Sequence, residues 1–213
     1  MILSERNLSM RDFFNEKADG YDEVHANLME PKLALTAALP AESKRILDVG
    51  IGTGLELFDL FKRIPDAQVT GIDISEKMLE ILKTRPFSDQ VTVINGNFFE
   101  VDFGGDYDAV ISSSALHHFT AEDKEKLYQK IFCALKPGGY FLNADCICNT
   151  KQEEAEAFAY YEANKELESH IDTALSVETE TELLQTVGFS LLSVTDLENP
   201  RYKLLVAKKD SNS

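Results

Sequence analysis

The fold of this chain is decided by the segment Ile46-Leu47-Asp48-Val49-Gly50-Ile51-Gly52-Thr53-Gly54. Apolar residues typical of a buried strand run directly into glycines at every second position, and a helical pattern follows at Leu57, Phe58, Leu60 and Phe61. Glycine lets a backbone turn sharply and approach a ligand without interference from a Cβ atom. The first turn of the helix then offers free N–H groups to an anionic group. The segment therefore predicts a strand, a tight turn at a ligand site and a helix.

The glycine spacing separates two kinds of ligand site. The dinucleotide-binding pattern is G-x-G-x-x-G, and Leu55 occupies the position of its third glycine here. This chain instead has G-x-G-x-G, and its next predicted strand, Val69-Thr70-Gly71-Ile72-Asp73, ends in an acidic residue. A carboxylate at that strand end can accept hydrogen bonds from both hydroxyls of a ribose. The combination favours an adenosine ligand and counts against a nicotinamide oxidoreductase.

Short β-branched runs alternate with helical patterns from Lys44 onward, which is typical of a parallel sheet with helices on both faces. The predicted parallel strands are Arg45–Val49, Gln68–Asp73, Gln90–Asn95, Tyr107–Ser112 and Tyr140–Asp145. Two final strands, Phe189–Val194 and Tyr202–Ala207, flank a short loop and should pair antiparallel. We therefore expect an α/β fold: a Rossmann-like, doubly wound sheet of seven strands, five parallel plus an antiparallel pair at one end.

Local signals mark where the intervening helices begin and end. Ser75 and Thr120 are predicted N-caps, and Thr120 forms a capping-box pattern with Asp123. The second of these helices is expected to end at Pro137-Gly138-Gly139, and a later one to end at Gly188.

Further motifs extend the pattern along residues 9–207, and together they resemble the class I S-adenosylmethionine-dependent methyltransferases. These motifs are the glycine turn Asp48–Gly54, Asp73 with Ile74 and Met78, Gly96-Asn97-Phe98, Tyr107–Ser112 with Leu116-His117-His118, and Leu135-Lys136-Pro137-Gly138-Gly139. The resemblance implies that S-adenosylmethionine is the cofactor and S-adenosylhomocysteine its product.

The resemblance also implies a role for individual residues in holding the cofactor. At the methionine half, Gly50, Gly52 and Gly54 would line the cofactor, Asp48 would lie near its ammonium, and Ser112 would offer its carbonyl to the amino-acid end. At the adenosine half, Asp73 would hold the ribose, Ile74 and Met78 would enclose the adenine, and Asn97 and the Phe98 backbone would bond the adenine edge. Tyr21 would touch the cofactor from the entry segment. Asn97 departs from the family, which more often has Asp at that position.

Two histidines follow the fourth predicted strand, where the acceptor is expected. Methyl transfer from a sulfonium needs a general base only if the nucleophile arrives protonated. His117 is the candidate catalytic residue, with His118 beside it, because a normal imidazole titrates near neutrality. The alternative is that the pair only packs or caps a short helix. No metal site is expected.

Two segments outside the sheet should enclose the acceptor within a single domain, residues 1–213. Residues 1–40 are expected to form a helical cover or lid, in which residues 9–38 carry Phe13, Phe14 and Tyr21. Residues 146–175 are expected to form a helical insertion over the acceptor pocket, with Phe158, Tyr160 and Tyr161. The glutamates of that insertion form either a solvated helix face or an acidic pocket for a cationic amine.

Composition narrows the partners. The net charge is −16, from 37 Asp and Glu against 21 Lys and Arg, so a phosphate backbone would be repelled. No apolar run reaches the length of a membrane span, and three cysteines form no disulfide framework. We therefore expect a soluble, cytoplasmic monomer or homodimer that methylates a small molecule. The alternatives are a methyltransferase or carboxymethyltransferase acting on tRNA, or a non-catalytic S-adenosylmethionine-binding protein.

Overall fold

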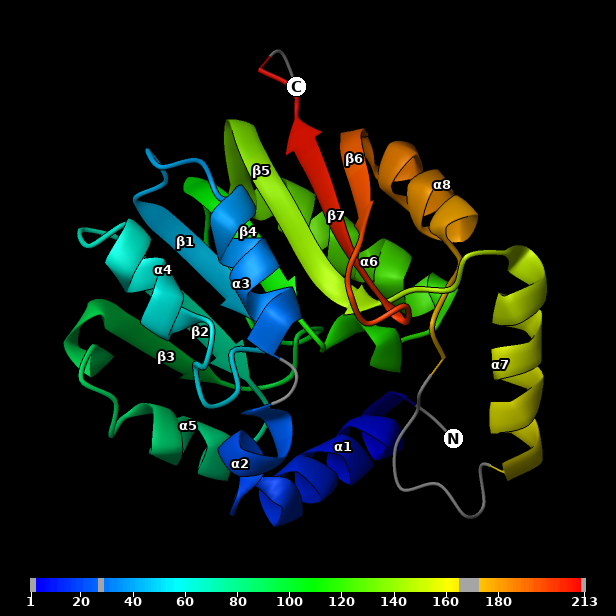
Figure 1. The fold of residues 1–213 in the computed structure, drawn as a ribbon, viewed down its shortest axis with the longest axis horizontal. Coiled ribbons are helices and arrows are strands. Elements are labelled where there is room, and N and C mark those ends of the chain that lie inside the picture. Colours follow the sequence, from blue (N-terminus) through cyan, green and yellow to red (C-terminus); the bar gives the residue numbers. More distant parts are fainter. Residues whose placement is uncertain (1–2, 27–28, 165–172, 212–213) are drawn as a thin grey trace.

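The computed structural model describes residues 3–26, 29–164 and 173–211, and it is built around one seven-stranded sheet (Figure 1). The strands lie in the order β3-β2-β1-β4-β5-β7-β6. Their bounds are β1 Arg45–Val49, β2 Gln68–Asp73, β3 Val91–Asn95, β4 Tyr107–Ser113, β5 Leu135–Cys146, β6 Phe189–Asp196 and β7 Tyr202–Lys209. β1 to β5 are parallel, and β7 inserts antiparallel between β5 and β6. The predicted topology, five parallel strands plus a terminal antiparallel pair, is confirmed.

Helices cover both faces of the sheet, as predicted. Their bounds are α1 Leu3–Lys17, α2 Tyr21–His25, α3 Met29–Ala38, α4 Leu57–Arg63, α5 Glu76–Leu82, α6 Ala121–Ala134, α7 Lys151–Asn164 and α8 Val177–Val187, with short 3-10 turns η2 Ser88–Gln90 and η3 Leu116–His118. One apolar cluster packs α3, α4 and α5 on the first face, and another packs α6 and α8 on the second. Within the described parts of the chain, no helix has the length and apolar character to cross a membrane.

The topology fixes the place of a ligand site. β1 pairs with β2 on one side and with β4 on the other. The strand order therefore reverses at β1, because the chain first builds the sheet toward one edge and then toward the other. Ligands of open α/β sheets bind at the carboxyl ends of strands beside such a reversal. β1 is buried along Ile46–Val49, as expected of a largely apolar strand covered on both faces, and this burial includes Asp48.

The predicted stop of α6 is wrong in one respect. The helix ends at Ala134, and Leu135 already has extended backbone angles and pairs with Tyr107 of β4. Pro137-Gly138-Gly139 therefore lies inside β5, in an irregularity of the ladder in which Gly138 has a φ of 81°. The three residues bend a strand rather than stop a helix, because pairing with β4 resumes at Tyr140. The predicted caps are confirmed: Ser75 accepts from Met78 N and Thr120 from Asp123 N.

The N-terminal segment divides into two parts. α3 packs against β4, β5, β7 and α4, and its Leu35 is fully buried, so it belongs to the core. α1 packs on α5 instead, below the carboxyl ends of the parallel strands, and α2 adjoins it (Figure 1). Among the described helices of this segment, α1 and α2 lie outside the core, and their role as a cover stays a prediction.

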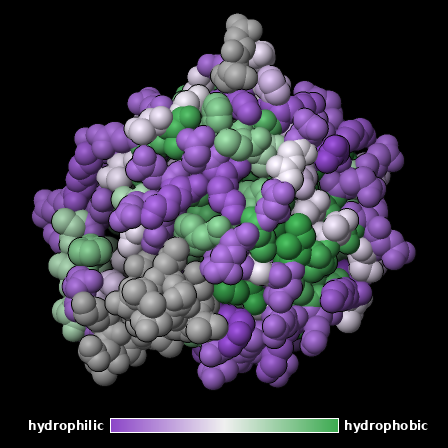
Figure 2. Space-filling model, turned by 180° about the vertical axis from the view of Figure 1, so that it is seen from behind, coloured by the Kyte–Doolittle hydropathy of each residue, from purple (hydrophilic) through white to green (hydrophobic). Residues whose placement is uncertain are grey.

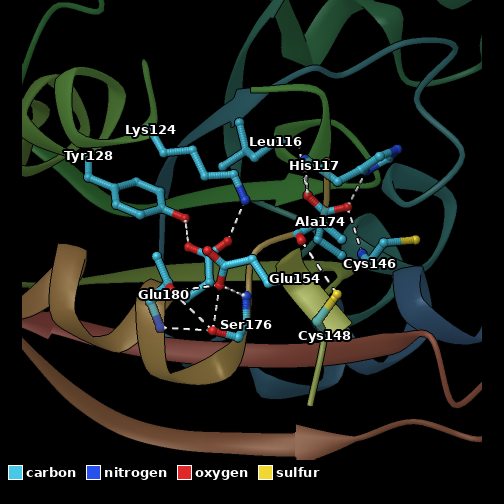
Figure 3. A network of polar contacts seen from close by, with 12 residues as sticks. Leu116, His117, Lys124, Tyr128, Cys146, Cys148, Glu154, Ala174, Ser176 and Glu180 are labelled. Atoms are coloured by element: carbon cyan, nitrogen blue, oxygen red, sulfur yellow. Dashed lines mark hydrogen bonds and ion pairs between the residues drawn. The ribbon is translucent and has the colours of Figure 1, made fainter. Parts of the chain in front are cut away.

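A buried polar cluster joins α6 to α8. Lys124 forms an ion pair with Glu180, and the Tyr128 hydroxyl donates to the other oxygen of Glu180 at 2.5 Å. The side chains of Lys124 and Glu180 are fully buried, and Figure 3 shows Lys124 and Tyr128 converging on Glu180. We call these three residues the α6–α8 cluster.

The segment between β3 and β4 crosses the second face without forming a helix. Phe99 and Val101 of this segment are only partly buried against the core, as is Ile94 of β3. Figure 2 shows an apolar area surrounded by hydrophilic side chains on the rear of the molecule. Lys130 of α6 holds the segment in place by donating to the backbone carbonyls of Phe98 and Val101.

Candidate functional site

One cavity, with about 740 Å³ of empty space, opens at the carboxyl ends of the central strands. Eight of the residues predicted to hold a cofactor line it: Tyr21, Gly50, Gly52, Asp73, Ile74, Met78, Asn97 and Phe98. Three others do not line it. Asp48 and the side chain of Ser112 are buried, and the Ser112 hydroxyl donates to the Val49 carbonyl, which ties β4 to β1. Gly54 completes the turn behind the cavity with a φ of 72°.

The glycine turn needs its glycines for two different reasons. Gly50 has a φ of 88°, and a Cβ added there would lie 2.5 Å from the Cβ of Ala115. Gly52 has a φ of 52°, yet an added Cβ would meet no atom within 4 Å. Gly52 therefore borders open space that a ligand can fill, whereas Gly50 permits close packing of the turn on the segment after β4.

Asp73 is held in one orientation at the cavity wall. Its Oδ2 accepts from the backbone N–H of Gly52 at 2.9 Å, and its Oδ1 accepts from that of Ser75 at 2.8 Å. Burial raises the pKa of Asp73 to about 6, although these backbone donors act in the opposite direction. The carboxylate is thus fixed beside the glycine turn with lone pairs left for a ligand.

Charged residues gather at the opposite wall, and sequence reasoning missed two of them. Lys32 of α3 donates to Glu56 Oε2 at 3.0 Å, and both side chains are almost completely buried. Asp48 Oδ2 and Glu56 Oε1 are buried without a hydrogen-bond donor among the described residues. A lysine within the apolar run of residues 31–39 is the sequence signal that could have found this pair.

The Asn97 side chain is used partly by its own turn. Its Oδ1 accepts from Phe99 N at 3.0 Å, and its Nδ2 lies 3.3 Å from Glu100 Oε1. Because Lys130 anchors the Phe98 carbonyl from behind, the backbone of this turn is placed firmly against the cavity.

The other end of the cavity is more apolar and contains His118. Met10 and Phe14 of α1 and Phe119 complete this end of the lining. The His118 ring lies 5.6 Å from the ring of Phe14 and 3.9 Å from that of His117. His118, rather than the predicted His117, therefore stands on the cavity wall.

His117 lies behind this wall, paired with the fully buried Asp145. Its Nδ1 is 2.5 Å from Asp145 Oδ1, while Asp145 Oδ2 accepts from the backbone N–H groups of Leu116 and His117. Burial opposes the charge of Asp145, but the imidazole of His117 holds the pKa of that carboxyl below its usual range. An aspartate in this position fixes the tautomer of a histidine and leaves its Nε2 free to accept a proton.

Cys146 brings a sulfur atom close to the same pair, and the N, O and S atoms of the three residues lie within 4.8 Å of one another (Figure 3). Both oxygens of Asp145 already accept two hydrogen bonds each, since Cys146 N also donates to Oδ1. A carboxylate offers about four lone-pair sites in all. The cluster is therefore explained by a histidine–aspartate pair and gives no support to a metal site.

The described part of the 146–175 insertion does not line this cavity. Tyr160 and Tyr161 of α7 line a second hollow with about 1340 Å³ of empty space, together with Cys146 and Arg201. Phe158 is exposed. Glu154, one of the predicted face glutamates, instead accepts from the backbone and hydroxyl of Ser176 and so clamps α7 to the start of α8. Residues 165–172 of the insertion lie outside the described residues.

Known proteins resemble this chain over its glycine turn and central strands. Residues 46–139 match the family model described as a methyltransferase domain. The chain is 30% identical over 131 residues to a carboxy-S-adenosyl-L-methionine synthase from Nautilia profundicola, covering 60% of this chain and 56% of that protein. It is 31% identical over 152 residues to a demethylmenaquinone methyltransferase from Symbiobacterium thermophilum, covering 65% and 59%. These matches support a class I S-adenosylmethionine-dependent methyltransferase domain over residues 46–139.

Solved structures share the fold of this chain. Human N-acetylserotonin methyltransferase, solved in complex with S-adenosylmethionine, superposes with a TM-score of 0.72 at 19% identity, covering 92% of this chain and 56% of that one. An S-adenosylmethionine-dependent methyltransferase from Mesorhizobium loti gives 0.69 at 22% identity, covering 82% and 95%. The chain spans a little over half the length of the first curated relatives it matches.

Proposed function

We propose that this chain transfers the methyl group of S-adenosylmethionine to a small molecule bound in the same cavity. The observation that carries the proposal is the convergence of eight sequence-predicted residues on one cavity beside the reversal of the sheet at β1. Two features fit a ligand with a cationic amino-acid end. They are the open space at Gly52, and the buried oxygens Asp48 Oδ2 and Glu56 Oε1, which have no hydrogen-bond partner among the described residues. When bound, the donor supplies a methyl group already activated by its sulfonium.

The roles proposed for the residues that hold the donor are those predicted from the sequence. Asp73 would accept from the ribose, and Ile74 and Met78 would enclose the adenine with Asn97 and Phe98 at its edge. Gly50 and Gly52 would border the amino-acid end. The roles proposed for Asp48, Gly54 and the Ser112 carbonyl at that end rest on the sequence, since these residues do not line the cavity. Tyr21 would close this side from α2. Burial raises the pKa of the Tyr21 hydroxyl, so it stays a neutral hydrogen-bond donor at physiological pH.

The acceptor end favours a small, largely apolar molecule. Met10, Phe14 and Phe119 supply apolar walls, and His118 is the titratable group among them. The acceptors named for two relatives are demethylmenaquinone and malonyl-acyl-carrier protein, neither of which is a nucleic acid. The net charge of −16 supports this preference over tRNA. A cytoplasmic location belongs to the same proposal and is supported by the three cysteines, none of which is in a disulfide.

The paired histidines support proton removal from the acceptor at this end of the cavity. His117 is the oriented member, because Asp145 fixes its tautomer, and His118 is the member on the wall. The role predicted for His117 therefore remains a proposal, with His118 placed between it and the acceptor end.

Calorimetry tests the donor half of the proposal. S-adenosylhomocysteine should bind with a micromolar dissociation constant and more tightly than NAD. Tighter binding of NAD would overturn the assignment of the cavity.

Transfer of labelled methyl groups tests the acceptor half. The protein is incubated with methyl-labelled S-adenosylmethionine and a fractionated cell extract, and label should appear in the small-molecule fraction. Label found only in the RNA or only in the protein fraction would contradict a small-molecule acceptor while leaving donor binding intact.

A further inference from the structure

An excess of negative charge surrounds the end of β1. Asp48 is the penultimate residue of that strand, Glu56 precedes α4, and Asp73 is the last residue of β2. Lys32 of α3 is the cation that contacts this group. Tyr21 of α2 is the remaining titratable group that faces it. If Asp48 and Glu56 were both ionised, these two residues and Lys32 together would carry a net negative charge, which is costly in a low-dielectric interior.

The hydrogen bonding of the two carboxyl groups points the same way. Glu56 Oε2 receives the Lys32 ammonium, but Glu56 Oε1 and Asp48 Oδ2 have no donor among the described residues. The two carboxyl groups contact each other, and that contact is a hydrogen bond only when one of them carries a proton. Burial, and then the neighbouring Glu56, raise the pKa of Asp48 well above its usual range.

We propose that Asp48 and Glu56 share one proton while the site is free, and that binding the amino-acid end of the donor releases this proton. The inference rests on the proposed donor site. Glu56 lines the cavity and Asp48 lies buried behind it, so the ammonium of the donor would bring its own positive charge to the side of the pair that Glu56 presents. This charge replaces that of the shared proton, and the proton leaves to the buffer. Donor binding therefore strengthens as the pH rises.

The test counts protons by calorimetry. S-adenosylhomocysteine is titrated into the protein at pH 7.5 in two buffers, phosphate and Tris, which differ in their heat of protonation. The difference between the two binding heats gives the number of protons released, expected to be about one per ligand. 5′-Methylthioadenosine carries the adenosine but lacks the amino-acid end, and it should release almost none. The pH lies well above the pKa of Asp73, about 6, so Asp73 contributes little.

A matched pair of variants locates the proton. Glu56→Gln removes one carboxyl group from the pair and should bring the release for S-adenosylhomocysteine close to zero. Asp59→Asn changes a carboxyl group on the neighbouring helix α4, where it is bonded to Thr36 and Arg63 outside the cavity. This control should keep the release of the unmodified protein. If Glu56→Gln fails to fold, the two ligands on the unmodified protein still decide the question.

The outcomes separate the inference from the function beneath it. Failure of S-adenosylhomocysteine to bind would overturn the proposed function. Binding without proton release, or equal release with both ligands, would overturn the shared proton and leave the donor site standing. Release with S-adenosylhomocysteine alone, lost in Glu56→Gln, supports the inference.

Discussion

Asp73 is oriented by two backbone N–H groups, and its raised pKa of about 6 makes it a titrating group close to neutrality. Above that pH it is a carboxylate that accepts from ribose hydroxyls, and below it a proton occupies one of the accepting lone pairs. The affinity for 5′-methylthioadenosine should therefore be up to about tenfold lower at pH 5 than at pH 7.5. Calorimetry across this range checks the profile. Asp73→Asn should bind more weakly and without this pH dependence, and a flat profile for the unmodified protein would contradict the role.

Removal of the same carboxylate gives a second prediction. Each charge-assisted hydrogen bond from a ribose hydroxyl to Asp73 contributes roughly 1.5–3 kcal/mol. Asp73→Ala should weaken S-adenosylhomocysteine binding by at least about tenfold, which corresponds to about 1.4 kcal/mol. Asp66→Ala is the control, because Asp66 is a highly exposed aspartate at the far end of β2. An unchanged dissociation constant in Asp73→Ala would mean that the ribose lies elsewhere.

Individual site residues differed in how far the sequence could predict them. Asp73 and the glycines follow from a local motif, because a strand end and a tight turn leave a pattern within nine or ten residues. Lys32 and Glu56 are 24 positions apart, and no periodicity connects them. The choice between His117 and His118 also needed the fold, because the partner of His117 is Asp145. Asp145 lies on β5, whereas His117 follows β4.

At the scale of elements, α1 and α2 are joined to the rest of the molecule by polar contacts beside the apolar contacts of Met10 and Phe14. Asp22 accepts from the Thr53 hydroxyl at 2.7 Å and forms an ion pair with Arg85. Asn15 accepts from the Ser75 hydroxyl at 2.8 Å. These contacts tie the cover to the glycine turn and to α5, which are the elements that border the donor. Such contacts open more cheaply than the apolar packing of α3.

The cover should therefore behave as a lid in hydrogen exchange. Backbone amides of α1 and α2 should exchange rapidly in the free protein and slow when S-adenosylhomocysteine binds. The amides of α3 should be protected in both states and serve as the internal control. Arg85→Gln should speed exchange of α2 in the free protein. Equal protection of α1 and α2 with and without ligand would show a fixed cover.

The α6–α8 cluster gives a prediction about stability. Lys124→Met would leave the Glu180 carboxylate buried without its cation, and loss of one partner of such a pair costs about 3–5 kcal/mol. Urea unfolding followed by circular dichroism measures this, which is convenient because the chain contains no tryptophan. Lys126→Met on the same helix removes an exposed pair with Glu122 and should leave the unfolding midpoint unchanged. Similar midpoints for the two variants would contradict the importance of the cluster.

Elements were predicted well wherever burial repeats along the chain. β1 and β2 begin and end at the predicted residues, because each has an apolar run and a turn at both ends. The start of β5 was misplaced because Pro137 and the two glycines after it are common in turns, and only pairing with β4 extends the strand through them. The position of α7 was also beyond reach, since a helix with no buried residue leaves little trace of its neighbours in the sequence.

At the scale of the whole molecule, the alternation of strands and helices was sufficient to predict the sheet. Right-handed crossovers between parallel strands limit the possible topologies, but the order β3-β2-β1-β4-β5 itself comes from the structure. No comparable rule predicts the walls of the acceptor end of the cavity. Its walls come from α1, from the turn after β4 and from the 3-10 turn η3, and their common boundary exists only in the folded molecule.

The insertion of β7 between β5 and β6 has a consequence for synthesis on the ribosome. β6 precedes β7 in the chain, yet it pairs only with β7, so it has no partner strand when it first emerges. Until β7 arrives, the edge of β5 also presents unpaired N–H and C=O groups. Once β6 has left the ribosome, the nascent chain therefore carries two open strand edges until β7 follows and pairs with both, and open edges of this kind favour aggregation.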